Sequence, residues 1–305
     1  MLDVCLLGTG GMMPLPNRWL SSMLIRFNGK MILVDCGEGT QITLKMLGWG
    51  FKNINTICFT HYHADHISGL PGMLLTLGNA ERTEPLTLVG PVGLEKVVNA
   101  LRTIANELPY EIYYKEIDNE NVHELILDGY TLKTCGAKHG VSCLAYSIET
   151  ERTGKFDLDK ALELKLPRNF WGLLQHGQEV VYDDKVYLPS MVMGERRKGF
   201  KITYCTDSRP TNDITLFAKN ADLFICEGMY AEKDKEDKAK ERKHMMFYEA
   251  ANMAKEASVK ELWLTHYSPS LTNPKEYLHV AKEIFENTKA GYDRIVKSFV
   301  YDDKD

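Results

Sequence analysis

Three histidines and one aspartate fall within six consecutive residues of this 305-residue chain, in the pattern H-x-H-x-D-H at residues 61–66. Imidazole and carboxylate groups are ligands that suit Zn²⁺, Mn²⁺ or Fe²⁺. We expect His61 and His63 to bind one ion, with Asp65 and His66 turned toward a second. Two ions about 3.5–4 Å apart can hold the attacking and the leaving oxygen of a phosphodiester during hydrolysis.

The segments beside this motif indicate how it is positioned. The apolar run at residues 54–59 is typical of a buried strand, and the apolar residues from 73 onward indicate a helix. The motif therefore falls on a strand-to-helix turn, where side chains can converge above a sheet. The alternative is a polar surface loop rich in histidine. Nine histidines serve the whole chain, and three of them in one such pattern favour the metal site.

Other candidate residues follow predicted strands in the same way. His139 comes after residues 131–135, Asp207 after 201–205 and His266 after 261–264. Loops at strand ends often carry functional residues, but His139 taken singly could equally be an ordinary loop histidine. Asp207 could bridge two ions or cap a helix that begins near Pro210. Asp35, after the strand at 31–34, could orient a ligand histidine or only occupy a turn.

The H-x-H-x-D-H motif is that of the metallo-β-lactamase superfamily. The runs I-L-V-D-C-G-E-G-T-Q at residues 32–41, G-L-P-G at 69–72 and T-H-Y-S-P at 265–269 resemble ribonuclease Z, the tRNA 3′-processing endonuclease family, in its short form. The resemblance covers about residues 2–299. It implies an α/β fold, a four-layer αββα metallo-β-lactamase sandwich, as a single domain over residues 1–305. Local patterns also predict helices over residues 94–108 and 274–290.

The resemblance assigns roles to the candidate residues. It implies that Asp65 orients or deprotonates the attacking water, and that His244, oriented by Glu227, stabilises the phosphorane or protonates the leaving oxygen. A helix-start histidine on the surface is the alternative for His244, and Met246 stands where the family has a small hydroxyl residue. Two divalent ions are expected, zinc first, with manganese or iron as alternatives. The implied metal ligands are His61, His63 and His139 on one ion, Asp65, His66 and His266 on the other, and Asp207 between them.

Residues 151–200 differ in character from the rest of the chain, with mixed charge and a basic run at the end. They resemble the protruding arm that grips tRNA in the ribonuclease Z family, although the Gly-Pro pairs that the family has near residues 170 and 194 are missing. A solvated loop is the alternative for the basic run. Phe170 or Trp171 could stack on RNA or pack in a core. The candidate RNA contacts are Arg168, Arg196, Arg197 and Lys198.

Composition sets wide limits on function. The net charge is −5 and the pI about 6.0, so RNA binding would need a local basic surface. The charge run at residues 232–243 predicts a solvated helix or mobile loop. Seven cysteines without a C-x-x-C pair indicate core residues in a reducing compartment. We see no signal segment and no membrane-spanning run, and we expect a cytoplasmic protein.

The resemblance to ribonuclease Z implies a metal-dependent endoribonuclease that removes the 3′ trailer of precursor tRNA. The resemblance adds a homodimer in which the arm of one subunit grips tRNA held by the other. Three alternatives remain: a hydrolase of the same fold that acts on small phosphodiesters or other esters, a lactamase or thioesterase, and a non-catalytic RNA-binding module. A set of seven metal ligands argues against the last of these.

Overall fold

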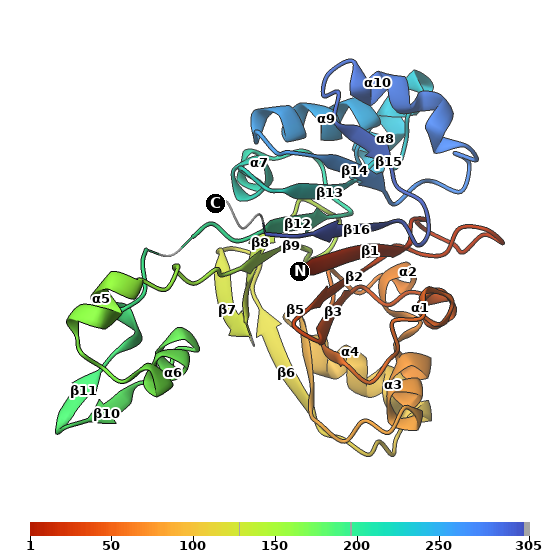
Figure 1. The fold of residues 1–305 in the computed structure, drawn as a ribbon. Helices are drawn as coiled ribbons and strands as arrows, with labels where there is room; N and C mark the ends of the chain where they lie inside the picture. Colours follow the sequence, from red (N-terminus) through yellow and green to blue (C-terminus); the bar gives the residue numbers. More distant parts are fainter. Residues whose placement is uncertain (128, 196, 302–305) are drawn as a thin grey trace. The chain divides into compact units, whose positions relative to one another are not determined.

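A computed structural model describes residues 1–127, 129–195 and 197–301 of the chain (Figure 1). The chain divides into two compact units. Of the described residues, unit 1 contains Met1–Glu149 and Phe200–Tyr301, and unit 2 contains Thr150–Gly199.

Unit 1 is built on two seven-stranded sheets. The first sheet has the order β16-β1-β2-β3-β4-β5-β6, and the second has the order β15-β14-β13-β12-β9-β8-β7. The strands of the first sheet are β1 (Leu2–Gly8), β2 (Ser22–Phe27), β3 (Lys30–Val34), β4 (Ile54–Cys58), β5 (Leu86–Pro91), β6 (Ile112–Ile117) and β16 (Val296–Phe299). Those of the second are β7 (His123–Leu127), β8 (Tyr130–Gly136), β9 (Leu144–Thr150), β12 (Lys201–Cys205), β13 (Leu223–Glu227), β14 (Leu262–Thr265) and β15 (Thr288–Ala290).

Strand β1 shows how both faces of a sheet are covered. All seven of its residues are buried. Because successive side chains of a strand point to opposite faces, Val4 and Leu6 enter the core between the two sheets, whereas Cys5 and Leu7 enter the core on the outer side of the first sheet. A strand that is buried on both faces reads as a continuous apolar run, and residues 4–7 of β1 read in this way.

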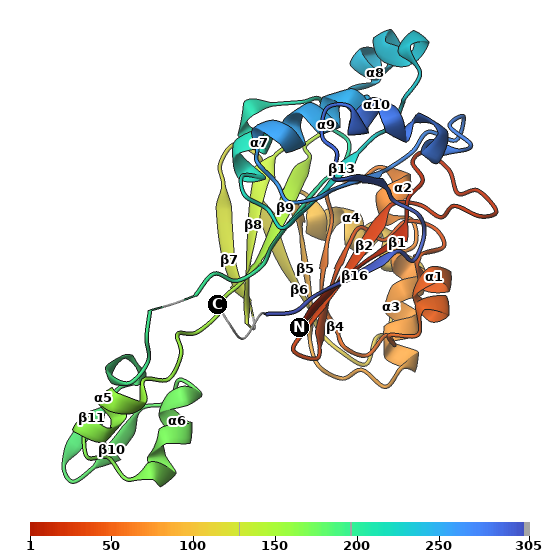
Figure 2. The ribbon, with the colours of Figure 1, turned by 45° about the horizontal axis from the view of Figure 1, so that its top comes forward.

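Helices cover the outer faces of both sheets (Figures 1 and 2). Those on the first sheet are α1 (Thr40–Leu47), α3 (Leu70–Asn79) and α4 (Leu94–Leu101), and those on the second are α7 (Asn212–Phe217), α9 (Phe247–Glu256) and α10 (Leu278–Lys282). The layers run helix, sheet, sheet, helix, so the predicted αββα sandwich is confirmed. The remaining helical elements of unit 1 are α2 (Ala64–Ile67), α8 (Glu236–Arg242) and the 3₁₀ turns η1 (Arg102–Ile104), η4 (Lys233–Lys235) and η5 (Pro274–Tyr277).

Two predicted helices are too long. The helix predicted over residues 274–290 ends at Lys282, and β15 follows, pairing in parallel with β14 at Leu262 and Thr288. Residues 288–290 form a strand because they hydrogen-bond to the edge of β14. The local helical spacing of the sequence gives no sign of this partner. The helix predicted over residues 94–108 ends as α4 at Leu101 and continues only as η1. Pro109 explains why Leu108 is not helical, because a residue before proline is disfavoured in a helix.

Unit 2 has a small core of its own. It comprises α5 (Leu158–Glu163), η2 (Arg168–Phe170), α6 (Trp171–Gln175), the hairpin of β10 (Val180–Tyr182) and β11 (Lys185–Tyr187), and η3 (Pro189–Met191). The two ends of the unit lie side by side, because the Arg197 N–H donates to the Arg152 carbonyl at 3.0 Å. The buried core residues are Ala161, Leu166, Leu174, Val180, Tyr187 and Val192.

Across the described residues, every helix is too short or too polar to cross a membrane.

Candidate metal centre

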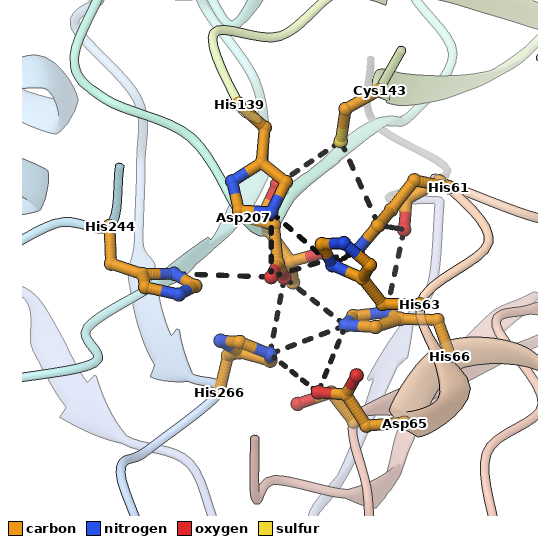
Figure 3. A network of polar contacts seen from close by, with 12 residues as sticks. His61, His63, Asp65, His66, His139, Cys143, Asp207, His244 and His266 are labelled. Carbon is orange, nitrogen blue, oxygen red and sulfur yellow. Dashed lines mark hydrogen bonds and ion pairs between the residues drawn. The ribbon is translucent and has the colours of Figure 1, made fainter. Parts of the chain in front are cut away.

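Strand register brings the candidate ligands to one edge of unit 1. In the first sheet Val34 of β3 pairs in parallel with Cys58 of β4, and in the second sheet Cys205 of β12 pairs in parallel with Cys226 of β13. The carboxyl ends of parallel strands lie at the same edge of a sheet. The loops that follow these strands therefore meet, and Figure 3 shows their side chains pointing toward a common centre.

A first cluster contains three imidazoles and one carboxylate. His61 Nε2 lies 2.9 Å from His63 Nδ1, and His139 Nε2 lies 3.4 Å from the same His63 atom. Asp207 Oδ2 lies 3.8 Å from Nε2 of both His61 and His139. All four ligand atoms lie within 4.8 Å of one another, which is the spacing that a single small cation requires.

A second cluster shares Asp207 with the first. Asp65 Oδ2 lies 3.5 Å from His66 Nε2 and 3.6 Å from His266 Nε2. The other oxygen of Asp207, Oδ1, lies 3.2 Å from His66 Nε2 and 3.1 Å from His266 Nε2. The two oxygens of Asp207 thus face different clusters, as an aspartate that bridges two ions must.

Two further observations test whether divalent ions fit here. Asp207 Oδ1 is buried and forms no well-aligned hydrogen bond within the described residues, with His66 Nε2 and His266 Nε2 at 3.2 Å and 3.1 Å. A buried carboxylate oxygen in that state is costly unless a cation satisfies it. Asp207 and His266 also have left-handed backbones, with φ of 52° and 57°. Such conformations cost energy in non-glycine residues and concentrate at functional sites. The donor set and its geometry fit divalent ions.

Local electrostatics keep part of the ligand set in the protonation state that can bind a metal ion. Burial lowers the pKa of the His61 and His139 imidazoles, so both are neutral and able to ligate at neutral pH. Burial also acts to raise the pKa of Asp207, but His266 and His66 outweigh it and hold that pKa well below its usual range. Asp65 behaves likewise: its hydrogen bonds to His266 and His66 outweigh burial, and its pKa is lowered.

Uptake of ions at the second cluster is expected to release protons. Burial disfavours the charged forms of His266 and His66, but Asp207 outweighs it, raising the pKa of His266 to about 10 and that of His66 well above its usual value. A protonated imidazole cannot ligate, so apparent affinity falls as pH falls, by about tenfold per pH unit for each proton displaced. Calorimetric Zn²⁺ titrations at about pH 6 and about pH 8, in buffers of different ionisation enthalpy, measure both quantities. Affinity independent of pH would contradict this expectation.

Asp35 supports the second cluster from behind. It is fully buried at the end of β3, and it accepts hydrogen bonds from the Thr60 N–H at 2.8 Å and from the Thr60 hydroxyl at 3.0 Å. Its Oδ2 also lies 2.8 Å from His66 Nδ1. A carboxylate on the far nitrogen of a ligand histidine fixes the ring and directs its other nitrogen to the ion. Here that nitrogen is His66 Nε2.

Asp35→Asn is therefore expected to weaken metal retention by about 10–100-fold, the usual effect of losing such a partner. Metal content after dialysis against a graded chelator measures it. Asp222→Asn is the matched control, because Asp222 is also buried but bonds to Lys260 and to the Lys201 N–H, outside the clusters. Equal metal retention in the two variants would show that Asp35 does not orient His66 for metal binding.

His244 and Glu227 form a buried pair beside the two clusters. His244 Nδ1 lies 3.0 Å from Glu227 Oε2, and Glu227 Oε1 accepts the Ser208 N–H at 2.5 Å. Burial lowers the pKa of His244, but the Glu227 carboxylate outweighs it, so the net shift is upward. The His244 ring lies 5.4 Å from the His139 ring and 5.5 Å from the His266 ring. The sequence-predicted partners are therefore adjacent, with His244 close to both clusters.

Several contacts at the site were not foreseen from the sequence. The Thr60 hydroxyl and the Cys143 sulfur lie 3.1 Å and 3.9 Å from His61 Nδ1, the nitrogen that faces away from the cluster. The Met12 N–H donates to Asp65 Oδ2 at 2.7 Å. Thr60 stands directly before the H-x-H-x-D-H motif, so its contact with His61 could have been predicted from the sequence. Nothing in the local pattern of residues 9–13 or 143–148 could have indicated the other two.

The clusters open into a cavity of about 460 Å³. Its walls include Met12, at the tip of the loop after β1, and Tyr230, at the start of the segment that leads into α8. Helix α8 contributes further lining residues. The charge run predicted to form a solvated helix or loop is thus a helix, but one of its faces borders the cavity. These additional lining residues are Lys238, Glu241, Arg242 and Lys243.

The candidate RNA contacts lie in unit 2. Arg168 and Lys198 are exposed, Arg197 is half-buried, and Arg196 lies outside the described residues. The Trp171 indole N–H donates to the Leu166 carbonyl at 2.9 Å, and both Phe170 and Trp171 pack against the core of unit 2. Of the two readings for these aromatic residues, packing in a core is the one observed.

Helices around two face-to-face sheets, with paired histidine and aspartate clusters at the carboxyl edge, define the metallo-β-lactamase-fold hydrolases, a class that binds divalent metal ions. Solved structures agree on the fold. Human tRNase Z, short form, matches with a TM-score of 0.70 at 24% identity, over 98% of this chain and 100% of that one. YhfI of Bacillus subtilis, a metallo-β-lactamase fold protein, matches with a TM-score of 0.69 at 20% identity, over 97% and 98% of the two chains.

Sequence relatives narrow the class. Ribonuclease Z of Lachnospira eligens is 57% identical over 304 residues, covering 100% of both chains. Ribonuclease Z of Clostridium acetobutylicum is 51% identical over 302 residues, covering 97% of this chain and 98% of that one. Residues 2–184 also match the family model described as Anti-Pycsar protein Apyc1. The chain belongs to the ribonuclease Z family, which confirms the predicted resemblance.

Proposed function

We propose that this chain is an endoribonuclease that removes the 3′ trailer of precursor tRNA by metal-dependent hydrolysis of one phosphodiester bond. The observation that carries the proposal is Asp207, whose two oxygens face two clusters of three further ligands each. Membership of the ribonuclease Z family supports the choice of RNA as the substrate.

Two divalent ions would occupy the clusters. The first would be held by His61, His63 and His139, and the second by Asp65, His66 and His266, with Asp207 between them. Zinc fits this mixed imidazole and carboxylate set best, and manganese or iron is the alternative. Such ions, when bound, favour ionisation of water near neutral pH and offset negative charge on the phosphoryl oxygens.

Asp65 is placed to position the attacking water. Its side chain is partly open to the cavity, 13% exposed, whereas that of His66 is fully buried. The Met12 N–H fixes one carboxylate oxygen at 2.7 Å. Its lowered pKa keeps Asp65 ionised at neutral pH, so it can orient the water that attacks phosphorus by accepting a hydrogen bond from it.

His244 is the proton donor in this proposal. Its Nδ1 is engaged by Glu227, so Nε2 is the nitrogen available to the substrate in the cavity that His244 lines. As the bond between phosphorus and the 3′-oxygen breaks, the proton on Nε2 passes to that oxygen. The products are a tRNA with a 3′-hydroxyl and a trailer that keeps the phosphate.

Unit 2 is proposed as the arm that holds the tRNA away from the cut, through Arg168, Arg196, Arg197 and Lys198. Because its two ends lie side by side, a short Gly-Ser linker can replace residues 152–197 without stretching unit 1. We expect this replacement to lower kcat/KM for precursor tRNA about 100-fold or more, through loss of phosphate contacts, and far less for bis(p-nitrophenyl) phosphate. Equal losses on both substrates would contradict an RNA-holding role for unit 2.

We further propose that the protein acts in the cytoplasm as a homodimer. The seven cysteines are all buried and free, as suits a reducing compartment. Light scattering during gel filtration measures the assembly state, and a monomer at working concentrations would contradict the homodimer.

The function itself is tested by incubating the protein, with Zn²⁺ or Mn²⁺ supplied, with a 3′-extended precursor tRNA and mapping the product ends. A single cut just after the unpaired base that follows the acceptor stem, leaving a 3′-hydroxyl, is expected. Hydrolysis of a small phosphodiester without any cut in the RNA would replace the proposal with a hydrolase of small phosphodiesters.

A further inference from the structure

Helix α8 presents two of its basic side chains to the catalytic cavity. Lys238 and Arg242 are four residues apart and so lie on the same face of the helix, and both line the cavity. Lys240, on the same helix, is not part of that lining. Figure 2 shows α8 projecting beyond α9 and α10, and Lys238 and Arg242 are both exposed.

The basic side chains of residues 235–242 differ in whether they form ion pairs. Lys240 pairs with Glu236 at 2.6 Å, and Lys235 pairs with Asp234 at 2.8 Å. Within the part of the chain that the structure describes, neither Lys238 nor Arg242 forms an ion pair. Lys235 and Lys240, which do not line the cavity, are thus neutralised by neighbours, whereas Lys238 and Arg242, which line it, keep their charge available.

Three contacts hold the basic face of α8 beside the metal centre. Lys238 Nζ lies 5.5 Å from the centre of the Tyr230 ring, which also lines the cavity. At the end of α8, Lys243 adopts a left-handed backbone with φ of 59° and donates from Nζ to the His139 carbonyl at 3.1 Å. Its own carbonyl lies 3.4 Å from His139 Nδ1. The helix end is therefore tied to a residue of the first cluster.

We propose that Lys238 and Arg242 form a phosphate clamp that seats the RNA backbone beside the scissile bond, an inference that rests on the proposed function. Lysine binds phosphate as a point charge and arginine as a two-pronged donor. Contacts of this kind position a nucleic acid without reading its sequence. Glu241, the one carboxylate that α8 adds to the lining, leaves the face with a net positive charge. The clamp favours a polynucleotide over a small phosphodiester, which has no neighbouring phosphates to reach it.

The test compares a double variant, Lys238→Ala with Arg242→Ala, with the matched control Lys240→Ala on the same helix. For each protein, kcat/KM for a 3′-extended precursor tRNA is measured over a range of salt concentrations, together with kcat/KM for bis(p-nitrophenyl) phosphate. The charge-conserving pair Lys238→Arg with Arg242→Lys is the rescue variant.

We expect the double variant to lose about tenfold or more in kcat/KM for the RNA relative to its change on the small diester. The slope of log kcat/KM against log salt should shrink by about 1.4–1.8, since each phosphate contact contributes about 0.7 to 0.9. The control should match the unaltered protein, and the rescue variant should recover most of the salt slope. An unchanged salt slope in the double variant, or equal losses on both substrates, would overturn the clamp. An unaltered protein that fails to cleave the RNA would overturn the proposed function and the clamp together.

Discussion

Asp207→Asn is expected to abolish trailer removal and to release at least one metal ion. The carboxylate is 3% exposed and sits between the two clusters, with Oδ2 facing His61 and His139 and Oδ1 facing His66 and His266. Loss of an outer partner of a ligand already costs about 10–100-fold in metal affinity, so loss of a shared ligand should cost more than about 100-fold. Metal analysis by mass spectrometry and cleavage of precursor tRNA measure the two effects.

The matched control for this variant is Asp213→Asn, an exposed position in the first turn of α7. It should retain full metal content and activity. An Asp207→Asn protein that holds as much metal as the control would show that this carboxylate does not bridge the clusters. Circular dichroism should show that both variants are folded. Asp207 occupies a left-handed backbone position that asparagine also tolerates, so Asp207→Asn is expected to fold.

His244→Ala is expected to slow cleavage by about 10²–10⁴-fold, the usual contribution of a positioned acid or base, while metal content holds. Its Nδ1 lies 3.9 Å from Asp207 Oδ2 and 3.0 Å from Glu227 Oε2, so the ring is adjacent to the clusters but engaged by Glu227. Single-turnover rates and metal analysis separate chemistry from metal binding. Metal loss in this variant would place His244 among the ligands instead.

A pH profile tests the same assignment through Glu227. An acid must be protonated to act, so the rate should fall as pH rises through the raised pKa of His244. Glu227→Gln removes the charge that raises this pKa, and the alkaline limb of the profile should move to lower pH. His279→Ala is a suitable control, since His279 is exposed and bonds only to the Glu276 carbonyl within the described chain. An alkaline limb that does not move would contradict the pairing.

Most of the fold and ligand positions of unit 1 could be predicted from strand patterns and local motifs. Ligands that follow buried strands, such as His61 after β4 and Asp207 after β12, could be predicted because parallel strands align their carboxyl ends. The span of β15 could not be predicted, because its hydrogen bonds to β14 come from a partner more than twenty residues away. Local spacing instead indicated a helix there.

Side-chain environments at the site were harder to predict from the sequence. Met246 precedes α9 without a side-chain hydrogen bond to the helix, and the Glu249 carboxylate accepts the Met246 N–H at 2.9 Å. Arg209 reinforces that corner by binding the Glu249 carboxylate and the His244 carbonyl. The face of α8 that borders the cavity was likewise invisible in a charge run, since only tertiary packing decides which lysines turn inward.

An anomalous difference map from crystals of the zinc-loaded protein, measured at the zinc absorption edge, tests the two-ion centre most directly. We expect two peaks, the first about 2.0–2.2 Å from His61, His63 and His139, and the second equally close to Asp65, His66 and His266, with one Asp207 oxygen on each. A single peak in fully active protein, or peaks bound by other residues, would contradict the centre on which the proposed chemistry depends.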